Sequence, residues 1–297
     1  MNRIQIDIAG TVLSATGGPG CPPLNISSSH MPFQVSERIP DIDLNIHVGD
    51  LPQVSWGEKI FDSRSTWRLY RHHDQYLIPI VSPASGPLPY RLLRVNDRFD
   101  AGEVNIRRGA LRQLASSLSA DFSVDPFEYP LDELFMVNFL ARNRQGVHLH
   151  ACGVQDNGRG LVFCGVSGAG KSTLAELWRP TGVNILSDER LIVRRRASGD
   201  FCLHGTPWTG DAGIGLPAAA PLEKLFIIQH APCNYIKPLA RMEAATQLLV
   251  RCFPPFYDRE AMGFVTELLD RIATEVPCFE LGFLPDASAV DFIRGLT

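Results

Sequence analysis

Residues 165–173 read Gly-Val-Ser-Gly-Ala-Gly-Lys-Ser-Thr, and this stretch decides how the rest of the chain is interpreted. It fits the pattern G-x-x-x-x-G-K-[ST] at every fixed position. In such a loop, consecutive backbone N–H groups point at a polyphosphate, the lysine reaches the outer phosphates and the following hydroxyl ligates Mg²⁺. A side chain at Gly165 or Gly170 would block the close backbone approach or the positive φ that these loops need.

The flanking sequence supports a phosphate-binding loop. Residues 160–164, Gly-Leu-Val-Phe-Cys, form an apolar run typical of a buried strand, and residues 172–178 predict a helix that Pro180 ends. Phosphates would then lie at a helix N-terminus, where free N–H groups and the helix dipole favour anions. A chance match is the alternative, but the chain has only four lysines, and one of them, Lys171, stands at the required position.

Composition limits the classes of protein. The 297 residues are enough for one large domain or two ordinary ones, and a net charge of −4 argues against nucleic acid as a partner. The seven cysteines are scattered without a C-x-x-C pair, which suits reduced thiols in the cytoplasm. No signal peptide is recognisable, and no run approaches the roughly 18 apolar residues that span a membrane. We therefore expect a cytoplasmic protein without a membrane partner.

The first 125 residues predict a β-rich accessory domain. Short alternating runs at 4–8, 44–48, 67–70, 76–81 and 90–95 are separated by turn residues, and a helix is predicted at 108–118. Residues 11–40 are rich in Gly, Ser and Pro and predict either a long loop or a partly disordered segment. No chemical motif appears here, so the domain is either structural or recruits a substrate.

A second domain is predicted from residue 126 to residue 297. Apolar spacing predicts helices at 131–141, 242–251 and 259–275, and strands at 146–154, 160–164, 183–190, 191–195, 201–204 and 225–229. Asn157-Gly158 predicts a tight hairpin into the strand before the phosphate-binding loop. The Gly-rich segment 209–220 is either a lid over substrate or a connecting loop.

Paired acids follow the phosphate-binding loop at an informative spacing. Asp188 and Glu189 come one helix and one strand after Lys171, so the chain has returned to the edge of the sheet that carries the loop. Carboxylates there can ligate a hard cation or take a proton from an attacking hydroxyl. The alternative is a strand end that is acidic and exposed. His148, His150 and Cys152 alternate on one strand face, which suits either buried histidines or, less often, a zinc site.

These blocks together resemble the HPr kinase/phosphorylase family, whose pattern is His-Gly, G-x-S-G-x-G-K-S and Asp-Asp-Arg. The likeness covers residues 145–195 well and the remaining C-terminal part loosely. It implies an α/β (α+β) domain of the HPr-kinase/phosphoenolpyruvate-carboxykinase-like type, and an ATP- and Mg²⁺-dependent transfer of a phosphoryl group to a serine hydroxyl. It also implies assembly into homo-oligomers.

The resemblance assigns roles by position. Asp188 corresponds to the base, Glu189 to a second acid that supports the metal, and His150 to the histidine beside the base. Mg²⁺ would be ligated by Ser172, Glu189 and Asp188. The nucleotide would be bound by the loop residues Gly165, Ser167, Gly168, Ala169, Gly170, Lys171, Ser172 and Thr173, with Lys171 also catalytic.

The departures from the pattern narrow the function. Ala151 and Glu189 replace a Gly and an Asp of the family, and the downstream segment used for phosphorolysis and for the HPr partner is missing. The chain therefore resembles a divergent branch that includes peptide serine kinases, and the acceptor is a hydroxyl of a peptide, protein or small molecule. A bifunctional kinase/phosphorylase and a nucleotide-binding regulator without turnover are the alternatives.

Overall fold

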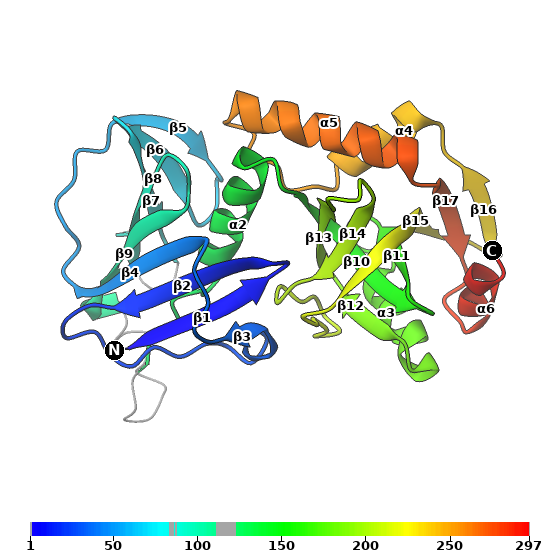
Figure 1. The fold of residues 1–297 in the computed structure, drawn as a ribbon, viewed down its shortest axis with the longest axis horizontal. Helices are drawn as coiled ribbons and strands as arrows, with labels where there is room; N and C mark the ends of the chain where they lie inside the picture. The colour runs from blue at the N-terminus through cyan, green and yellow to red at the C-terminus, as the bar shows by residue number, and fades with distance from the viewer. Residues whose placement is uncertain (1, 83–85, 87, 111–122, 297) are drawn as a thin grey trace. The chain divides into compact units, whose positions relative to one another are not determined.

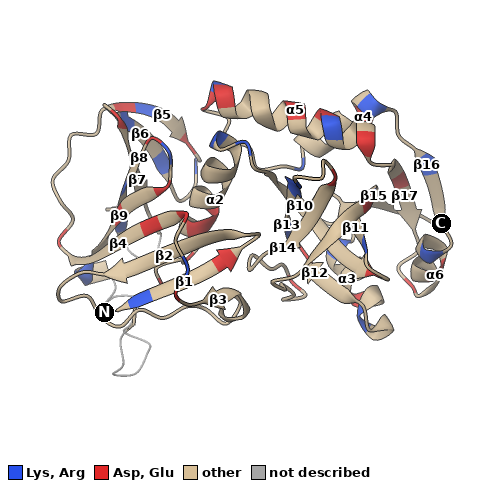
Figure 2. Ribbon diagram, viewed as in Figure 1, with Lys and Arg blue, Asp and Glu red and all other residues tan. Residues whose placement is uncertain are grey.

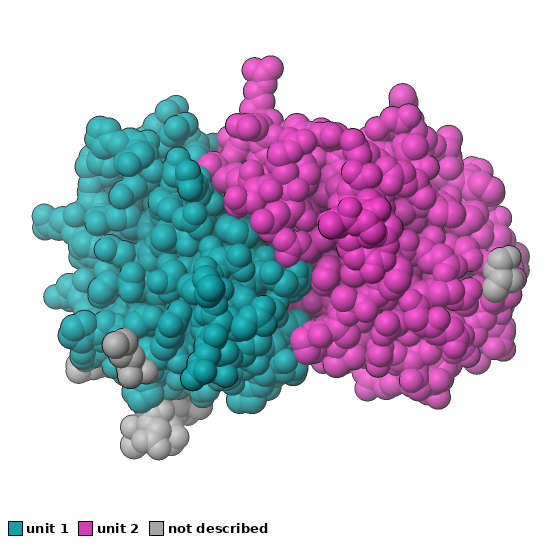
Figure 3. Space-filling model, viewed as in Figure 1, with its two compact units in different colours: residues 1–139 teal, residues 140–297 magenta. Residues whose placement is uncertain are grey.

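A computed structural model describes residues 2–82, 86, 88–110 and 123–296. The chain divides into two compact units, Met1–Phe139 and Leu140–Thr297 (Figure 3). Each unit is built on one large sheet, and the chain also contains helices, so the protein is of mixed α/β class. No helix in the described part of the chain is long and apolar enough to cross a membrane.

Unit 1 is a nine-stranded sheet of order β3-β1-β2-β4-β9-β8-β7-β6-β5 (Figure 1). Its elements are β1 (Arg3–Ile8), β2 (Thr11–Gly17), η1 (Met31–Phe33), β3 (Gln34–Val35), β4 (Ile42–Gly49), β5 (Glu58–Asp62), β6 (Arg68–His72), β7 (Gln75–Ile80), β8 (Arg91–Asn96) and β9 (Ala101–Arg107). In β4, Ile42, Leu44 and Ile46 are buried and alternate with exposed polar residues. This period of two buries one face of the strand and exposes the other.

The prediction for unit 1 is confirmed for five strands, and within the segment 11–40 it is wrong for residues 11–17 and 34–35, which form β2 and β3. That segment contains β2, which pairs with β1 in register from Arg3–Thr16 to Ile8–Thr11. The hairpin is possible because Ala9 and Gly10 both adopt positive φ, at 56° and 79°. Strands β5 and β9 were not predicted. Of the helix expected at 108–118, residues 108–110 are helical, and residues 111–118 lie outside the described residues.

Unit 2 has a sheet whose order is β11-β10-β13-β14-β15-β17-β16, with β12 beside β10 and an additional pairing of β11 with β15. Helix α2 (Leu131–Arg142) contains the division between the two units. The elements that follow it are β10 (Val147–Asp156), β11 (Arg159–Cys164), α3 (Lys171–Trp178), η3 (Arg179–Thr181), β12 (Asn184–Ser187), β13 (Arg190–Arg195), β14 (Phe201–Gly205), β15 (Ala219–His230), β16 (Tyr235–Pro238), α4 (Arg241–Leu249), α5 (Arg259–Glu275), β17 (Cys278–Phe283) and α6 (Ser288–Arg294). Because β15 pairs with β14 at its start and with β11 further on, strands β10, β13, β14, β15 and β11 close into a ring.

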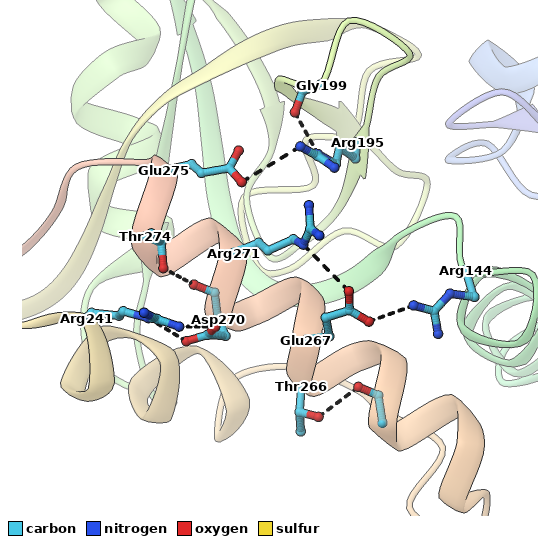
Figure 4. A network of polar contacts seen from close by, with 11 residues as sticks. Arg144, Arg195, Gly199, Arg241, Thr266, Glu267, Asp270, Arg271, Thr274 and Glu275 are labelled. Atoms are coloured by element: carbon cyan, nitrogen blue, oxygen red, sulfur yellow. Dashed lines mark hydrogen bonds and ion pairs between the residues drawn. The ribbon is translucent and has the colours of Figure 1, made fainter.

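Helices cover both faces of this sheet. On one face, Leu149 and Ala151 of β10 belong to a core cluster with side chains of α4 and α5. On the other, Cys152 and Val154 belong to a cluster with α3 and α6 (Figure 1). The sheet is therefore buried on both sides, which explains why its strands are apolar runs in the sequence. The outer side of α5 carries charged pairs instead, such as Arg241 with Asp270 (Figures 2 and 4).

Most elements predicted for unit 2 are confirmed, including α5 at Arg259–Glu275 and the hairpin at Asn157-Gly158, where both residues have positive φ. The strand predicted over 183–190 is confirmed for residues 184–187 and wrong in its continuation over residues 188–190. Strand β12 ends at Ser187 and β13 begins at Arg190. Asp188 and Glu189 therefore lie in the break between two strands, where their side chains need not alternate.

Candidate functional site

The loop of residues 165–170 joins β11 to α3, as the sequence predicts. Gly168 and Gly170 have φ of +80° and +100°, a conformation that side-chain-bearing residues rarely adopt. A Cβ on Gly170 would lie 2.6 Å from the Phe283 ring, and one on Gly165 would lie 2.7 Å from Ala169 Cβ. Gly165 and Gly170 are therefore required, because the loop packs tightly against its own Ala169 and against Phe283 of β17.

Lys171, the first residue of α3, is the buried cation of this loop. The residue is 8% exposed, and Nζ donates to the carbonyl oxygens of Gly165 at 3.1 Å and Val166 at 3.3 Å. Burial lowers the pKa of this ammonium group, which the charge of Glu189 partly opposes. Within the described residues, no carboxylate lies within ion-pair distance of it. The positive charge is therefore held by carbonyl dipoles, and it adds to the positive end of α3 in favouring an anion.

A cavity of about 380 Å³ opens over this loop. Its walls come from segments far apart in the sequence, and they consist of His150, Ser167, Gly168, Gly170, Lys171, Ser172, Thr173, Glu189, Gly210, Asp211 and His230. Most of the residues singled out in the sequence are thus brought together. Three of them, Gly165, Ala169 and Asp188, do not line the cavity.

Asp188 is fully buried, at 0% exposure. Its carboxylate accepts backbone N–H groups from Gly210 at 2.9 Å, Ala212 at 2.8 Å and Ile214 at 3.3 Å. The side chain is thus engaged by the segment 210–214, whereas the neighbouring Glu189 faces the cavity. The two adjacent acids have different surroundings, which the sequence did not distinguish.

Glu189 lies beside His150 in the cavity wall. The His150 Nε2 is 3.6 Å from Glu189 Oε1, too far for a hydrogen bond. Burial, with the nearby charges of Lys171 and Arg190, lowers the pKa of His150 to about 4. The imidazole is therefore neutral at pH 7 and forms no ion pair with Glu189. His150 is held in place through its backbone N–H, which donates to the carbonyl oxygen of Arg251 at 2.7 Å.

His230 is a cavity residue that the sequence does not identify, and Gly210 and Asp211 are covered only through the predicted segment 209–220. His230 ends β15, which runs parallel to β11, so its place at the same sheet edge as the loop could have been inferred from the pairing of these strands. Gly210 and Asp211 belong to the Gly-rich segment for which the sequence offers a lid or a connecting loop. Both line the cavity, so this segment reaches the site.

The donor set around the loop fits magnesium better than zinc. The hydroxyl of Ser172 and the carboxylates of Glu189 and Asp211 are oxygen ligands, which Mg²⁺ prefers. Among the described residues, no group of three or more His, Cys, Asp or Glu could hold a metal by itself, so the alternative of zinc at His148, His150 and Cys152 is not supported. Burial also raises the pKa of the Cys152 thiol, which disfavours the thiolate that zinc needs. Mg²⁺ commonly keeps phosphates and waters as its other ligands, and the cavity leaves room for them.

Comparisons with known proteins give a match to a family model and matches to solved structures. Residues 131–253 match the family model described as SynChlorMet cassette protein ScmC, which covers less than half of the chain. The solved structure of the Hpr(Ser) kinase/phosphatase from Coxiella burnetii is 14% identical over 43% of this chain and 92% of that chain, with a TM-score of 0.22. A TM-score this low does not establish a shared fold. No curated protein has a significant match to the sequence.

Proposed function

We propose that this protein is an ATP- and Mg²⁺-dependent kinase that transfers a phosphoryl group to a serine hydroxyl of a peptide, protein or small molecule. One observation carries the proposal. A buried lysine without a carboxylate partner in the described residues shares one cavity with a carboxylate and a neutral histidine. A protein that only binds a nucleotide needs the loop, the lysine and a metal ligand, but it does not need a proton acceptor for an attacking hydroxyl.

The phosphate side of the cavity supports nucleotide binding. The backbone of residues 165–170, the N-terminus of α3 and Lys171 present N–H groups and positive charge to one space. ATP, when bound there, would supply the phosphoryl group to be transferred. Ser172 and Asp211 would ligate Mg²⁺, which leaves the Glu189 carboxylate free, and Lys171 would move from the loop carbonyls to the outer phosphates.

The other side of the cavity supports transfer to a hydroxyl. Phosphoryl transfer needs positioning, neutralisation of charge and a group that takes the proton of the nucleophile. Glu189 is placed for the last role, because its carboxylate faces the cavity while that of Asp188 is engaged elsewhere. We therefore assign the proton acceptor to Glu189. His150, neutral and next to it, would orient the carboxylate or the incoming hydroxyl.

The test is phosphorylation of a serine-containing peptide pool with ATP and Mg²⁺, read by mass spectrometry alongside nucleotide affinity. The variants are Lys171→Ala and Glu189→Gln, with Lys224→Ala as a control because Lys224 bonds to Glu223 and Leu296 outside the cavity. Loss of the serine phosphate in both variants, with nucleotide still bound by Glu189→Gln, supports the proposal. Nucleotide binding without transfer to any acceptor favours a regulator instead. Transfer that reverses with inorganic phosphate favours a bifunctional kinase/phosphorylase, and absence of nucleotide binding refutes all three.

A further inference from the structure

The segment 210–214 is an irregular loop whose base and tip are held in different ways. Its base pairs with β12, where Ser187 bridges Gly215 and Leu216 N–H donates to Leu186 at 2.9 Å. Its tip has one internal turn, from Gly213 N–H to the carbonyl oxygen of Gly210 at 3.1 Å. Three of its backbone N–H groups point to the single carboxylate of Asp188. A buried carboxylate with three donors is a strong anchor because charge-assisted hydrogen bonds are among the strongest in proteins.

The tip of this loop forms part of the cavity wall. Gly210 and Asp211 both line the cavity. A Cβ on Gly210 would lie 3.0 Å from Asp188 Oδ2 and 3.1 Å from Glu189 Oε2, so the backbone here touches both carboxylates. The position of the loop tip therefore determines where Asp211 stands, and it limits the orientation of Glu189.

We infer that Asp188 is a positioning residue that acts on the reaction through the loop of residues 210–214, and that it does not itself take the proton. This inference rests on the proposed kinase function. A proton acceptor needs a free lone pair within about 2.6–3.2 Å of the hydroxyl. Asp188 is fully buried, outside the cavity wall, and its oxygens face backbone N–H groups. Its contribution is to hold Gly210 against Glu189 and to present Asp211 to the cavity.

The experiment combines a double-mutant cycle with amide hydrogen exchange. The single variants are Asp188→Asn, which weakens the anchor, and Gly210→Ala, which pushes the tip outward while Asp188 stays intact. The matched control is Asp156→Asn, because Asp156 is also a buried acid of unit 2 but binds Arg294 at 2.9 Å, away from the cavity residues. Serine phosphorylation, its pH profile and the affinity for Mg²⁺-ATP are measured for each variant.

The expected result is faster exchange of the amides of residues 210–214 in Asp188→Asn and not in Asp156→Asn. Turnover should fall by about 10–100-fold in both Asp188→Asn and Gly210→Ala, less than the roughly 10²–10⁴-fold of a lost proton acceptor. The double variant should be no slower than the slower single one, because both act through the same loop. The residual activity should keep the pH profile of the wild type.

Two outcomes would overturn the inference: unchanged exchange in residues 210–214, or effects of Asp188→Asn and Gly210→Ala that simply multiply. If Asp188→Asn does not fold, Gly210→Ala alone decides, since a loop without influence on the site would leave its turnover at the wild-type level. If the wild type transfers no phosphate, the proposed kinase function fails separately. Exchange and Mg²⁺-ATP affinity then still decide whether Asp188 controls the cavity through the loop.

Discussion

The buried charges beside the cavity of unit 2 are held differently from two buried charges of unit 1. In unit 1, the fully buried Asp132 is matched by His30 at 2.8 Å, and the buried Arg91 is paired with Glu128. In unit 2, the buried charges of Lys171 and Asp188 face backbone carbonyl and N–H groups, and within the described residues neither has an ion-pair partner. A charge neutralised by a side chain serves the fold. A charge held only by backbone dipoles beside a cavity can be recruited by a ligand, as Lys171 can by a phosphate.

The largest effect is expected when Lys171 is removed, because its charge should serve ligand binding and not stability. Lys171→Ala should abolish measurable Mg²⁺-ATP binding, because the loop would lose its only buried cation, whereas the unfolding midpoint should stay the same or rise. The rise is possible because a buried charge costs free energy unless it is paired. Calorimetric titration and thermal unfolding measure the two effects. An unfolding midpoint far below that of the wild type would mean that Lys171 is structural, like the charges of unit 1.

Removing Asp132 from its pair with His30 in unit 1 should give the reverse pattern, a loss of stability with unchanged nucleotide affinity. Asp132→Asn should destabilise unit 1 by about 3 kcal/mol, since removal of one member of a buried pair leaves the other without compensation. Ser27 also reaches His30 Nδ1, at 2.7 Å, so the histidine ties two segments together. Nucleotide affinity of the remaining folded protein should be unchanged. Urea unfolding followed through the amides of unit 1 measures the loss, and Asp74→Asn, an exposed acid of the same unit, is the control.

The pH dependence should differ in sign between the units. Burial lowers the pKa of His30, but the hydrogen bond and charge of Asp132 outweigh it, so the folded pKa lies above the usual 6.5. The stability that this pair adds is present below pH 6.5 and is lost as pH rises through the folded pKa. Burial lowers the pKa of His148 and, to about 4, that of His150. These two histidines resist protonation in the fold, so unit 2 loses stability as pH falls below 6.5 toward pH 4.

The measurement is amide exchange of each unit between pH 4.5 and 8.5, converted to a free energy of opening. Each histidine contributes a slope of at most about 1.4 kcal/mol per pH unit within its window. His150→Gln should flatten the acid slope of unit 2 in part and leave that of unit 1 untouched. Parallel slopes in the two units would contradict the contrast in their buried histidines.

The sequence predicted elements with strong periodicity and missed those defined by long-range pairing. Helix α5 was predicted to the residue because Val265, Leu268, Leu269 and Ile272 repeat at helical spacing and are all buried. Strand β2 was missed because Gly17, Gly18 and Pro19 make its surroundings read as a loop. Its identity depends on pairing with β1 and β4, which local sequence does not encode.

The candidate site was predicted where a motif fixes the backbone and missed where the tertiary fold sets the direction of a side chain. The phosphate-binding loop carries its own geometry in its glycines, so Lys171 and Ser172 were found. The different surroundings of Asp188 and Glu189 were not, because they depend on a strand break after Ser187 and on N–H groups more than twenty residues later. The same holds for Asp211, which reaches the cavity only because this loop folds back.

The smallest effect is expected for the exposed ion pairs along α5. Two sets of ion pairs lie on the solvent side of this helix (Figure 4). Asp270 pairs with Arg241, and Glu267 pairs with both Arg144 and Arg271. Arg241→Ala should leave the unfolding midpoint and the nucleotide affinity unchanged within error, because exposed ion pairs gain little and are screened by salt. Arg142→Ala should be more harmful, since its partner Asp258 is half-buried and also caps α5 through the N–H groups of Glu260 and Ala261. Equal effects of the two variants in low salt would show that exposure does not decide the value of a charge in this unit, and the contrast drawn for Lys171 would lose its physical basis.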